Sequence, residues 1–384
     1  MLNNRIMHIL LVVVVVIILL SGYGVAQISS KTPVRIGLIT EQTGAASMSG
    51  ERGIRATKLA LKQVNAAGGV HGTPVDVGIY DNNSTTQGTV NAVNKAIEDK
   101  VIALSGPGRS THTQAAAPIL KENAIPAIIG STAVHLTKQG NPWLFRVRPD
   151  DSIYGSAMAE YLIRDLKITK IGIIHDADAF GTGGADIITE TMKKHNLTPV
   201  RRERYTMGTK DYTAQLLNIK NAGAEGLALY TTNAEDAAVI FRQVKELGIK
   251  WQMVGVPSSV SQVVIDLAKD ASEAVYGVVD YFAGANPRSQ AFRDAYSKEY
   301  NQEPDFFCAY PYETLVLLVD VMKRARTTTD RNKIRETILA TKGYKGIQGT
   351  FTYTPNGDGL HEVNIVQMKG GKLQYIRTVS ISPQ

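Results

Sequence analysis

The amino-acid sequence predicts an α/β fold with two doubly wound parallel-sheet lobes. From Pro33 onward, short apolar runs of strand length alternate with amphipathic stretches of helix length, which is typical of parallel sheets covered by helices on both faces. Behind a leader of about 26 residues, about 358 residues remain, enough for two domains of ordinary size. Cys308 is the single cysteine, so disulfides and Cys-based metal sites are excluded and stability must come from packing.

The first 26 residues have the pattern of a secretory signal peptide. Arg5 precedes an unbroken apolar run, Ile9 to Leu20, and small residues follow at Gly24 and Ala26. The run has 12 residues, whereas a membrane-spanning helix needs about 20, so a retained membrane anchor is the less favoured alternative. We expect a mature chain that begins near Gln27 and works in the periplasm.

Eight segments are predicted to be strands, four in each half of the mature chain. The first half contains Val34–Thr40, Val75–Tyr80, Val101–Ser105 and Pro126–Ile129. The second half contains Lys170–His175, Val200–Tyr205, Gly226–Tyr230 and Gln252–Val256.

One helix has clear signals at both ends. Asn233 can cap its start, its first turn holds Glu235 and Asp236, and Gly248 ends it. Its apolar face includes Ile240. This segment is therefore predicted to be an amphipathic helix that packs on the second sheet.

Four of the predicted strands run directly into segments that carry hydroxyl or amide side chains. In chain order these segments are Gly106–Thr111, Gly130–Thr132, Thr231–Asn233 and Pro257–Ser259. In doubly wound sheets, ligands bind outside the carboxyl ends of the strands, where helix N-termini offer free N–H groups to an anion. Each of these side chains could instead be an ordinary helix cap, but their recurrence in both halves favours a ligand cleft between two lobes.

The sequence contains no motif for a cofactor, a metal or a catalytic nucleophile. Gly106-Pro107-Gly108 follows a strand, but Thr111 stands where a dinucleotide loop needs its third glycine. No phosphate loop, zinc-binding helix or nucleophile elbow occurs. His112 and His135 follow candidate cleft loops, although a surface or core role is the favoured interpretation. We therefore predict no cofactor, no metal and no catalytic residue, while a triad assembled in space stays open.

The net charge of +7 comes from basic residues that are spread along the chain. The densest run, Arg201-Arg202-Glu203-Arg204, is interrupted by an acid. Because an exported protein meets no nucleic acid, the basic residues indicate a solvated surface or a docking face rather than a phosphate-binding patch.

Several segments resemble one family along most of the mature chain. These segments are Val34-Arg35-Ile36-Gly37, Asn65 to Gly72 with its Asn-x-x-Gly-Gly-Val-x-Gly turn, Tyr80-Asp81, Gly106 to Ser110, Ile173 to Asp176 with Phe180-Gly181, and Lys210-Asp211-Tyr212. In them the sequence resembles the leucine/isoleucine/valine-binding (branched-chain amino acid) family of periplasmic solute-binding proteins.

The resemblance implies a type I periplasmic-binding fold, in which three hinge crossovers join the two lobes. It places lobe 1 at residues 27–148 plus 283–346 and lobe 2 at residues 149–282 plus 347–384. The crossovers are expected near Arg148–Asp150, Phe282–Ala285 and Lys345–Gly349. The last segment, Thr350 to Ile376, is expected to return to the second lobe as short strands.

The resemblance also implies ligand contacts in the first lobe. The family's serine that holds the ligand carboxylate matches Ser110, and the neighbouring loop that supplies hydroxyl and carbonyl contacts matches Ser131, Thr132 and Ala133. Arg109, beside Ser110, is an alternative carboxylate clamp.

In the second lobe, the aromatic residue that closes over the ligand matches Phe180, and the next contact falls at Asn233. The acid that pairs with the ammonium of an amino acid should follow Gln252–Val256, where this chain has Ser258 instead. Tyr310 could line an apolar part of the pocket or pack in the core.

Family membership implies that the chain is the solute-binding protein of an ABC importer, which captures a branched-chain amino acid or a related small carboxylate by hinge closure. Its expected partners are an inner-membrane permease and its ATPase, and a monomer is expected. The missing acid leaves open a ligand without an amine, including aromatic carboxylic acids, because a buried ammonium without a carboxylate is costly. The same scaffold could instead serve as an extracytoplasmic sensor or as a secreted hydrolase. Asp81 and Asp211 are interpreted as structural residues that cap or brace loops.

Overall fold

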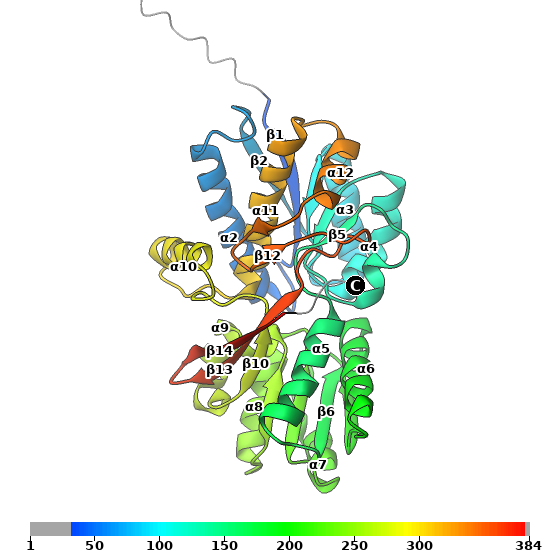
Figure 1. Ribbon diagram of the computed structural model, residues 1–384, viewed down its shortest axis with the longest axis vertical. Coiled ribbons are helices and arrows are strands. Elements are labelled where there is room, and N and C mark those ends of the chain that lie inside the picture. The colour runs from blue at the N-terminus through cyan, green and yellow to red at the C-terminus, as the bar shows by residue number, and fades with distance from the viewer. Residues whose placement is uncertain (1–31, 381–384) are drawn as a thin grey trace, which may run out of the picture. The chain divides into compact units, whose positions relative to one another are not determined.

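Two sheets organise the structure, one in each of two α/β lobes (Figure 1). The computed structural model describes residues 32–380, so the predicted leader lies outside the described residues. Both lobes belong to the compact unit Pro33–Gln384. None of the helices described between residues 32 and 380 combines the length and the apolar character needed to cross a membrane.

The first sheet has five parallel strands in the order β2-β1-β3-β4-β5. The strands are β1 (Val34–Thr40), β2 (Val75–Asp81), β3 (Ala103–Ser105), β4 (Ala127–Ile129) and β5 (Leu144–Arg146). Helices cover both faces, because the apolar residues of α2 (Ser47–Ala66), α11 (Phe306–Ala325) and α12 (Arg331–Leu339) share one core, and those of α3 (Thr86–Glu98) and α4 (Ser110–Glu122) share another.

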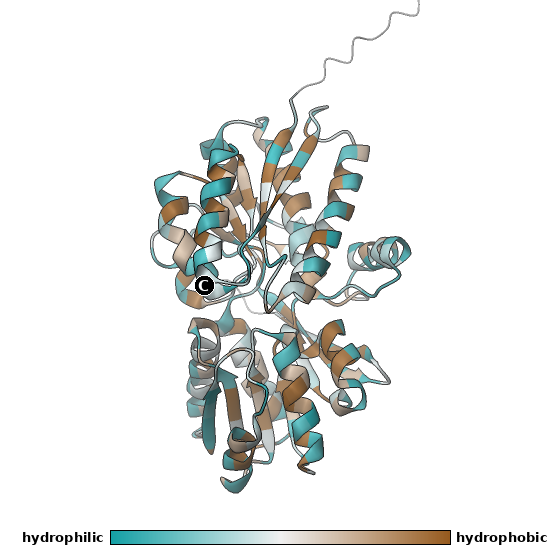
Figure 2. Cartoon of the chain, turned by 180° about the vertical axis from the view of Figure 1, so that it is seen from behind, coloured by the Kyte–Doolittle hydropathy of each residue, from teal (hydrophilic) through white to brown (hydrophobic). Residues whose placement is uncertain are grey.

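The second sheet has seven strands in the order β14-β13-β10-β9-β8-β6-β7, and β13 and β14 are antiparallel to their neighbours. The strands are β6 (Ile171–Asp176), β7 (Arg201–Tyr205), β8 (Gly226–Tyr230), β9 (Gln252–Gly255), β10 (Tyr276–Val279), β13 (Glu362–Lys369) and β14 (Lys372–Ser380). One face is covered by α5 (Asp151–Glu160) and α6 (Ala179–Lys194), and the other by α7 (Thr213–Asn221), α8 (Ala234–Glu246) and α9 (Gln262–Ala268). Figure 2 shows the hydrophobic strands enclosed by helices whose outer sides are hydrophilic.

All eight predicted strands are present, and β1 and β8 have the predicted bounds. The helix predicted after Asn233 is α8, which ends at Glu246. The expected four strands per lobe were too few. β5 and β10 have three and four residues, and short strands of this kind, one of them ending in Arg146, leave no distinct apolar run in the sequence.

The chain crosses between the lobes at residues 147–150, again at residues 280–286, and a third time near His361. The third crossover therefore lies later than the predicted Lys345–Gly349, and residues 347–360 belong with the first lobe rather than the second. The reason is packing: Phe351 is buried in the first lobe's core, and the backbone of Arg146 exchanges hydrogen bonds with Gly357 and Gly359. The prediction that Thr350 to Ile376 returns to the second lobe as short strands therefore holds only from Glu362 onward, where β13 and β14, of eight and nine residues, join the second sheet.

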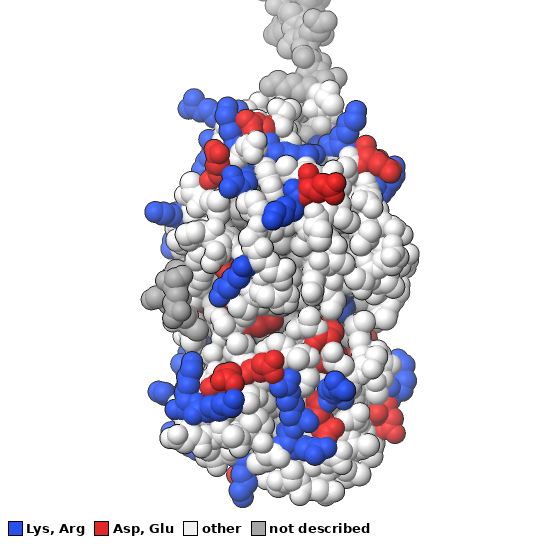
Figure 3. Space-filling model, turned by 90° about the vertical axis from the view of Figure 1, so that its right-hand side faces the viewer, with Lys and Arg blue, Asp and Glu red and all other residues white. Residues whose placement is uncertain are grey.

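Charged side chains of both signs are interspersed on the face seen in Figure 3. The basic run in β7 is paired locally, since Arg201 lies 2.5 Å from the Glu203 carboxylate and Arg202 lies 2.5 Å from Asp186. These contacts support the prediction of a solvated surface at this run.

Candidate functional site

A cavity lies between the two lobes, at the carboxyl-terminal ends of their strands. It is lined by Glu41, Ser49, Gly108, Arg109, Ser110, Thr132, Arg148, Tyr154, Phe180, Thr232, Val256, Pro257, Ser258, Phe306, Phe307 and Tyr310. The lining therefore combines loops that follow β1, β3 and β4 of the first sheet with loops that follow β6, β8 and β9 of the second. This is the position at which doubly wound sheets bind ligands.

Ser110 is the first residue of α4, a helix of 13 residues. The Ser110 hydroxyl oxygen accepts a hydrogen bond from the backbone N–H of Ala133 at 3.2 Å, so its own O–H remains available to donate. The first N–H groups of a helix have no partner within the helix, and the helix dipole favours negative charge there. Ser110 therefore offers a hydroxyl and a helix N-terminus to an anionic group.

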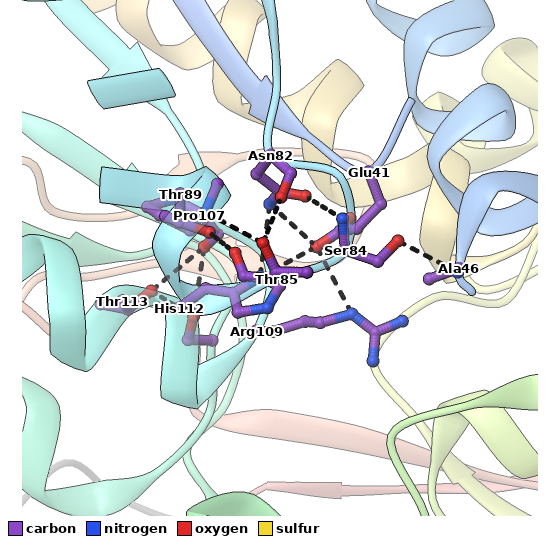
Figure 4. A network of polar contacts seen from close by, with 12 residues as sticks. Glu41, Ala46, Asn82, Ser84, Thr85, Thr89, Pro107, Arg109, His112 and Thr113 are labelled. Atoms are coloured by element: carbon purple, nitrogen blue, oxygen red, sulfur yellow. Dashed lines mark hydrogen bonds and ion pairs between the residues drawn. The ribbon is translucent and has the colours of Figure 1, made fainter. Parts of the chain in front are cut away.

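Arg109 and Glu41 form a buried charged network beside Ser110 (Figure 4). The Nε atom of Arg109 lies 3.4 Å from Oε1 of Glu41, which also receives Nδ1 of His112 and Nδ2 of Asn82 at 3.4 Å. Burial alone would raise the pKa of Glu41, but the hydrogen bond with His112 and the charge of Arg109 outweigh it and lower the pKa to about 2. Glu41 is therefore ionised at neutral pH and holds Arg109 in place.

The free end of Arg109 points away from this network in Figure 4. Its Nη1 atom contacts the sulfur of Met207 at 3.3 Å, and its Nη2 atom has no hydrogen-bond partner among residues 32–380. A guanidinium presents five N–H donors, so Arg109 has donors to spare for a bound anion.

Arg148 is the second cation of the cavity, and it is fully engaged by the protein. Its Nε and Nη2 atoms bind the Asp280 carboxylate at 2.7 and 3.2 Å. Its Nη1 atom donates to the carbonyl of Gly130 at 3.0 Å. The guanidinium carbon also lies 4.6 Å from the ring centre of Phe306 and 5.8 Å from that of Tyr310. An ion pair and cation–π contacts therefore fix the position of the Arg148 side chain.

Five aromatic rings form most of the apolar wall. Tyr154 and Phe180 come from the second lobe, and Phe306, Phe307 and Tyr310 come from the N-terminal part of α11. Two glycines after β3 and β4 make room for one of these rings, because a Cβ atom at Gly108 or Gly130 would overlap Tyr310. The apolar lining is therefore largely aromatic, and Val256 and Pro257 are its aliphatic members.

The polar groups of the second lobe are held by their own neighbours. The backbone N–H of Thr232 donates to Asp176, and the Ser258 hydroxyl donates to the carbonyl of Thr231. Burial, together with the charge of Asp178, raises the pKa of Asp176 to about 7.

Six of the nine predicted ligand-binding residues line the cavity, namely Arg109, Ser110, Thr132, Phe180, Ser258 and Tyr310. Ser131 does not, because its hydroxyl faces inward to Thr113 and the carbonyl of Pro107. Ala133 contributes its N–H to Ser110 instead of facing the cavity. Asn233 does not line the cavity either, because it is buried at the start of α8, where its side chain makes no capping hydrogen bond. The preceding residue, Thr232, lines the cavity in its place.

Other lining residues had no signal in the sequence analysis. Glu41 follows β1 directly. The search for polar side chains that follow a predicted strand would have found it if carboxylates had been included with hydroxyls and amides. Arg148 belongs to the first crossover, and its role depends on Asp280 in the second crossover, which is 132 residues away. Phe306 and Phe307 had the appearance of ordinary core residues in an aromatic stretch.

Among residues 32–380, no group of three or more His, Cys, Asp or Glu side chains could hold a metal ion. Asp81 accepts hydrogen bonds from the backbone of Thr43 and Asn83, and Asp211 accepts one from the backbone of Thr213. Both acids therefore brace loops, as predicted.

A family model described as periplasmic binding protein matches residues 33–372. A relative from Brucella abortus, called Leu/Ile/Val-binding protein homolog 1, is 29% identical over 357 residues, which cover 88% of this chain and 92% of the relative.

Solved structures of similar fold include binding proteins with related names. The leucine-binding protein LivK from Thermotoga maritima superposes with a TM-score of 0.84 at 26% identity, covering 90% of this chain and 99% of that one. LivJ from Streptococcus pneumoniae, a branched-chain amino acid transporter substrate-binding protein solved with isoleucine, has a TM-score of 0.83 at 25% identity, covering 92% and 100% of the two chains.

Proposed function

The chain belongs to the periplasmic binding protein family, and we propose that it is the solute-binding protein of an ABC importer that captures a branched-chain amino acid or a related small carboxylate. Members of this family work outside the cytoplasm. A periplasmic location reached through a cleaved leader is part of the proposal. The proposed partners are an inner-membrane permease and its ATPase, and the protein acts as a monomer that binds its solute without chemical conversion.

The observation that carries the proposal is the position of the cavity between the two lobes. The helix N-terminus at Ser110 belongs to one lobe, whereas Phe180 and Ser258 belong to the other. A ligand that touches all three stabilises the closed arrangement, because only that arrangement brings the two sets of contacts together. The three crossovers are the natural hinges for this movement.

Enclosure also fits the affinity that such a small ligand needs. A micromolar dissociation constant corresponds to a binding free energy of about −8 kcal/mol. For a ligand of roughly nine heavy atoms this is about 0.9 kcal/mol per atom, which is high among the binding energies per atom that small ligands reach. Contacts from both sides are therefore required.

Thermal unfolding of the mature protein, refolded to remove co-purified ligand, tests the proposal. The panel contains leucine, isoleucine, valine, small aliphatic acids and aromatic carboxylates. Ligand at a hundredfold excess over its dissociation constant adds about 2.7 kcal/mol, which raises Tm by several degrees. If no carboxylate of the panel raises Tm, the proposal is wrong.

The substitution Ser110→Ala identifies the carboxylate anchor. Loss of the hydroxyl should weaken every ligand that binds the wild type, by about 1.5 to 3 kcal/mol for a hydrogen bond to a charged group. The variant Ser84→Ala is a control, because the Ser84 hydroxyl donates to the carbonyl of Thr43 outside the cavity. Equal affinity of wild type and Ser110→Ala would remove Ser110 from the anchor role.

A further inference from the structure

We propose that the cavity selects a carboxylate without an α-ammonium group, and that the ligand carries an aromatic ring. This inference rests on the proposed function and names the substrate class of the same site. It follows from which hydrogen-bonding groups the cavity offers and which it has already used.

An ammonium group needs acceptors, and the protein itself uses three backbone carbonyls of the loops after β4 and β8, of which that of Thr132 belongs to the cavity lining. The carbonyl of Gly130 accepts from Arg148 at 3.0 Å. The carbonyl of Thr132 accepts from Arg146 at 2.6 Å and from the backbone of Asp151 at 2.8 Å. In the second lobe, the carbonyl of Thr231 accepts from Ser258.

The side chains lead to the same result. Among residues 32–380, Glu41 is the only acid in the cavity lining. Its Oε1 atom faces Arg109, His112 and Asn82, whereas its Oε2 atom has no hydrogen-bond partner in this part of the chain. The loop after β9, which would be the second lobe's source of an acid, presents Ser258 and no carboxylate. A buried ammonium would therefore lie near two guanidinium groups and would have to share the Glu41 carboxylate with Arg109, which is less favourable than an ion pair of its own.

Donors, by contrast, are abundant at one end of the cavity. Arg109 has an unpartnered Nη2 atom within the described part of the chain, although its side chain is only 8% exposed. Ser110, with its hydroxyl and the first N–H groups of α4, lines the same cavity as Arg109. Charge-assisted hydrogen bonds from such donors to a carboxylate are the strong ones.

The remainder of the ligand meets rings. Phe180 packs on Tyr230 with ring centres 4.8 Å apart, and Phe306 packs on Phe307 at 3.9 Å. These contacts, together with Arg148 over the ring of Phe306 at 4.6 Å, restrain rings that line the cavity. A planar aryl group can make offset or edge-to-face contacts with such rings, which a branched aliphatic side chain cannot.

Two pairs of ligands that differ only in the α-ammonium group test the inference: 3-phenylpropanoate with phenylalanine, and 4-methylpentanoate with leucine. Titration calorimetry on the refolded protein gives the four affinities. In each pair the acid without the amine should bind at least tenfold more tightly, and 3-phenylpropanoate should bind more tightly than 4-methylpentanoate.

The possible failures are distinguishable. Equal or tighter binding of the amino acids would overturn the inference and leave the proposed function intact, with Oε2 of Glu41 as the partner of the ammonium. Tighter binding of 4-methylpentanoate would overturn the aromatic assignment. Absence of binding by all four would overturn the inference and count against the proposed function as well.

A double variant tests the part played by Arg148. Arg148→Met with Asp280→Asn removes both charges together, so neither is left buried alone, and it frees the carbonyl of Gly130. The preference for 3-phenylpropanoate over phenylalanine should fall at least threefold. The control is Arg293→Met with Glu303→Gln, a bidentate pair outside the cavity, which should keep the preference. If the double variant folds and keeps the preference unchanged, Arg148 does not disfavour the ammonium group. If the double variant does not fold, the calorimetry of the two ligand pairs with the wild-type protein still tests the inference.

Discussion

Glu41→Gln removes the charge that holds Arg109 while keeping an acceptor of the same shape. The pKa of Glu41 falls from 4.5 to about 2 in the folded protein, and a shift of one unit is about 1.4 kcal/mol. The carboxylate is buried, with 4% of the residue exposed, so solvent screens it little. The charge therefore contributes up to about 3 kcal/mol to the free energy of unfolding at neutral pH.

The pH at which this contribution disappears follows from the direction of the shift. A carboxyl whose pKa is lowered by folding stabilises the protein above its unfolded pKa, and the contribution is lost as the pH falls from about 4.5 to about 2. Wild type and Glu41→Gln should therefore differ by up to about 3 kcal/mol at pH 7 and hardly at all near pH 2.

Urea unfolding of both proteins between pH 2 and pH 7 measures the difference. The control is Glu51→Gln, because Glu51 pairs with Arg55 on the surface with 61% of its side chain exposed, and such pairs contribute about 0.2 to 1 kcal/mol. If Glu41→Gln costs no more than this control at pH 7, or if its effect does not shrink in acid, the assignment of Glu41 as the charged support of Arg109 is wrong.

Three further predictions concern buried groups. Burial and the charge of Asp178 raise the pKa of Asp176 to about 7, so the native protein holds this proton and loses stability as the pH rises from about 4 to 7. Asp176→Asn should abolish that loss, which is worth up to about 4 kcal/mol in urea unfolding at pH 8. A variant less stable than wild type at pH 8 would contradict this prediction. Burial raises the pKa of the Cys308 thiol to about 12, so a thiol reagent should label it in urea but not in native buffer, and rapid native labelling would contradict its burial. Asp358→Asn leaves the fully buried Arg146 without its carboxylate and should cost about 3 to 5 kcal/mol in the same assay, unlike a surface control such as Asp320→Asn.

The sequence was sufficient for the parts of the fold that depend on local pattern. Gly226–Tyr230 has its predicted bounds because it is a continuous apolar run, which is what a strand buried on both faces requires. Val34–Thr40 also has its predicted bounds, although it contains one charged and exposed residue, Arg35. The third crossover was misplaced because its position depends on packing between distant segments. Phe351 could have packed on either lobe as far as local pattern shows, and its place in the first lobe's core is decided by packing with residues distant in the sequence.

The candidate site divides in the same way. Ser110 and Ser258 were found because they follow strands, and the topology carries all such residues to one edge of each sheet. Ser131 follows a strand as well, but its hydroxyl turns inward to Thr113, and no rule about spacing states which way a side chain in a loop turns. Arg148 was missed because its function comes from Asp280 and Gly130, neither of which is near it in sequence.

The position of Arg148 links ligand selection to lobe movement. Arg146 ends β5 and Arg148 follows it by two residues, and both bind carbonyls of the loop after β4. Arg148 also lies in the first crossover and is paired with Asp280 in the second. The Arg148–Asp280 pair therefore ties two crossover segments together at the cavity. A change at this pair should alter the hinge equilibrium and the ligand preference together, whereas a change at Ser110 should alter affinity alone.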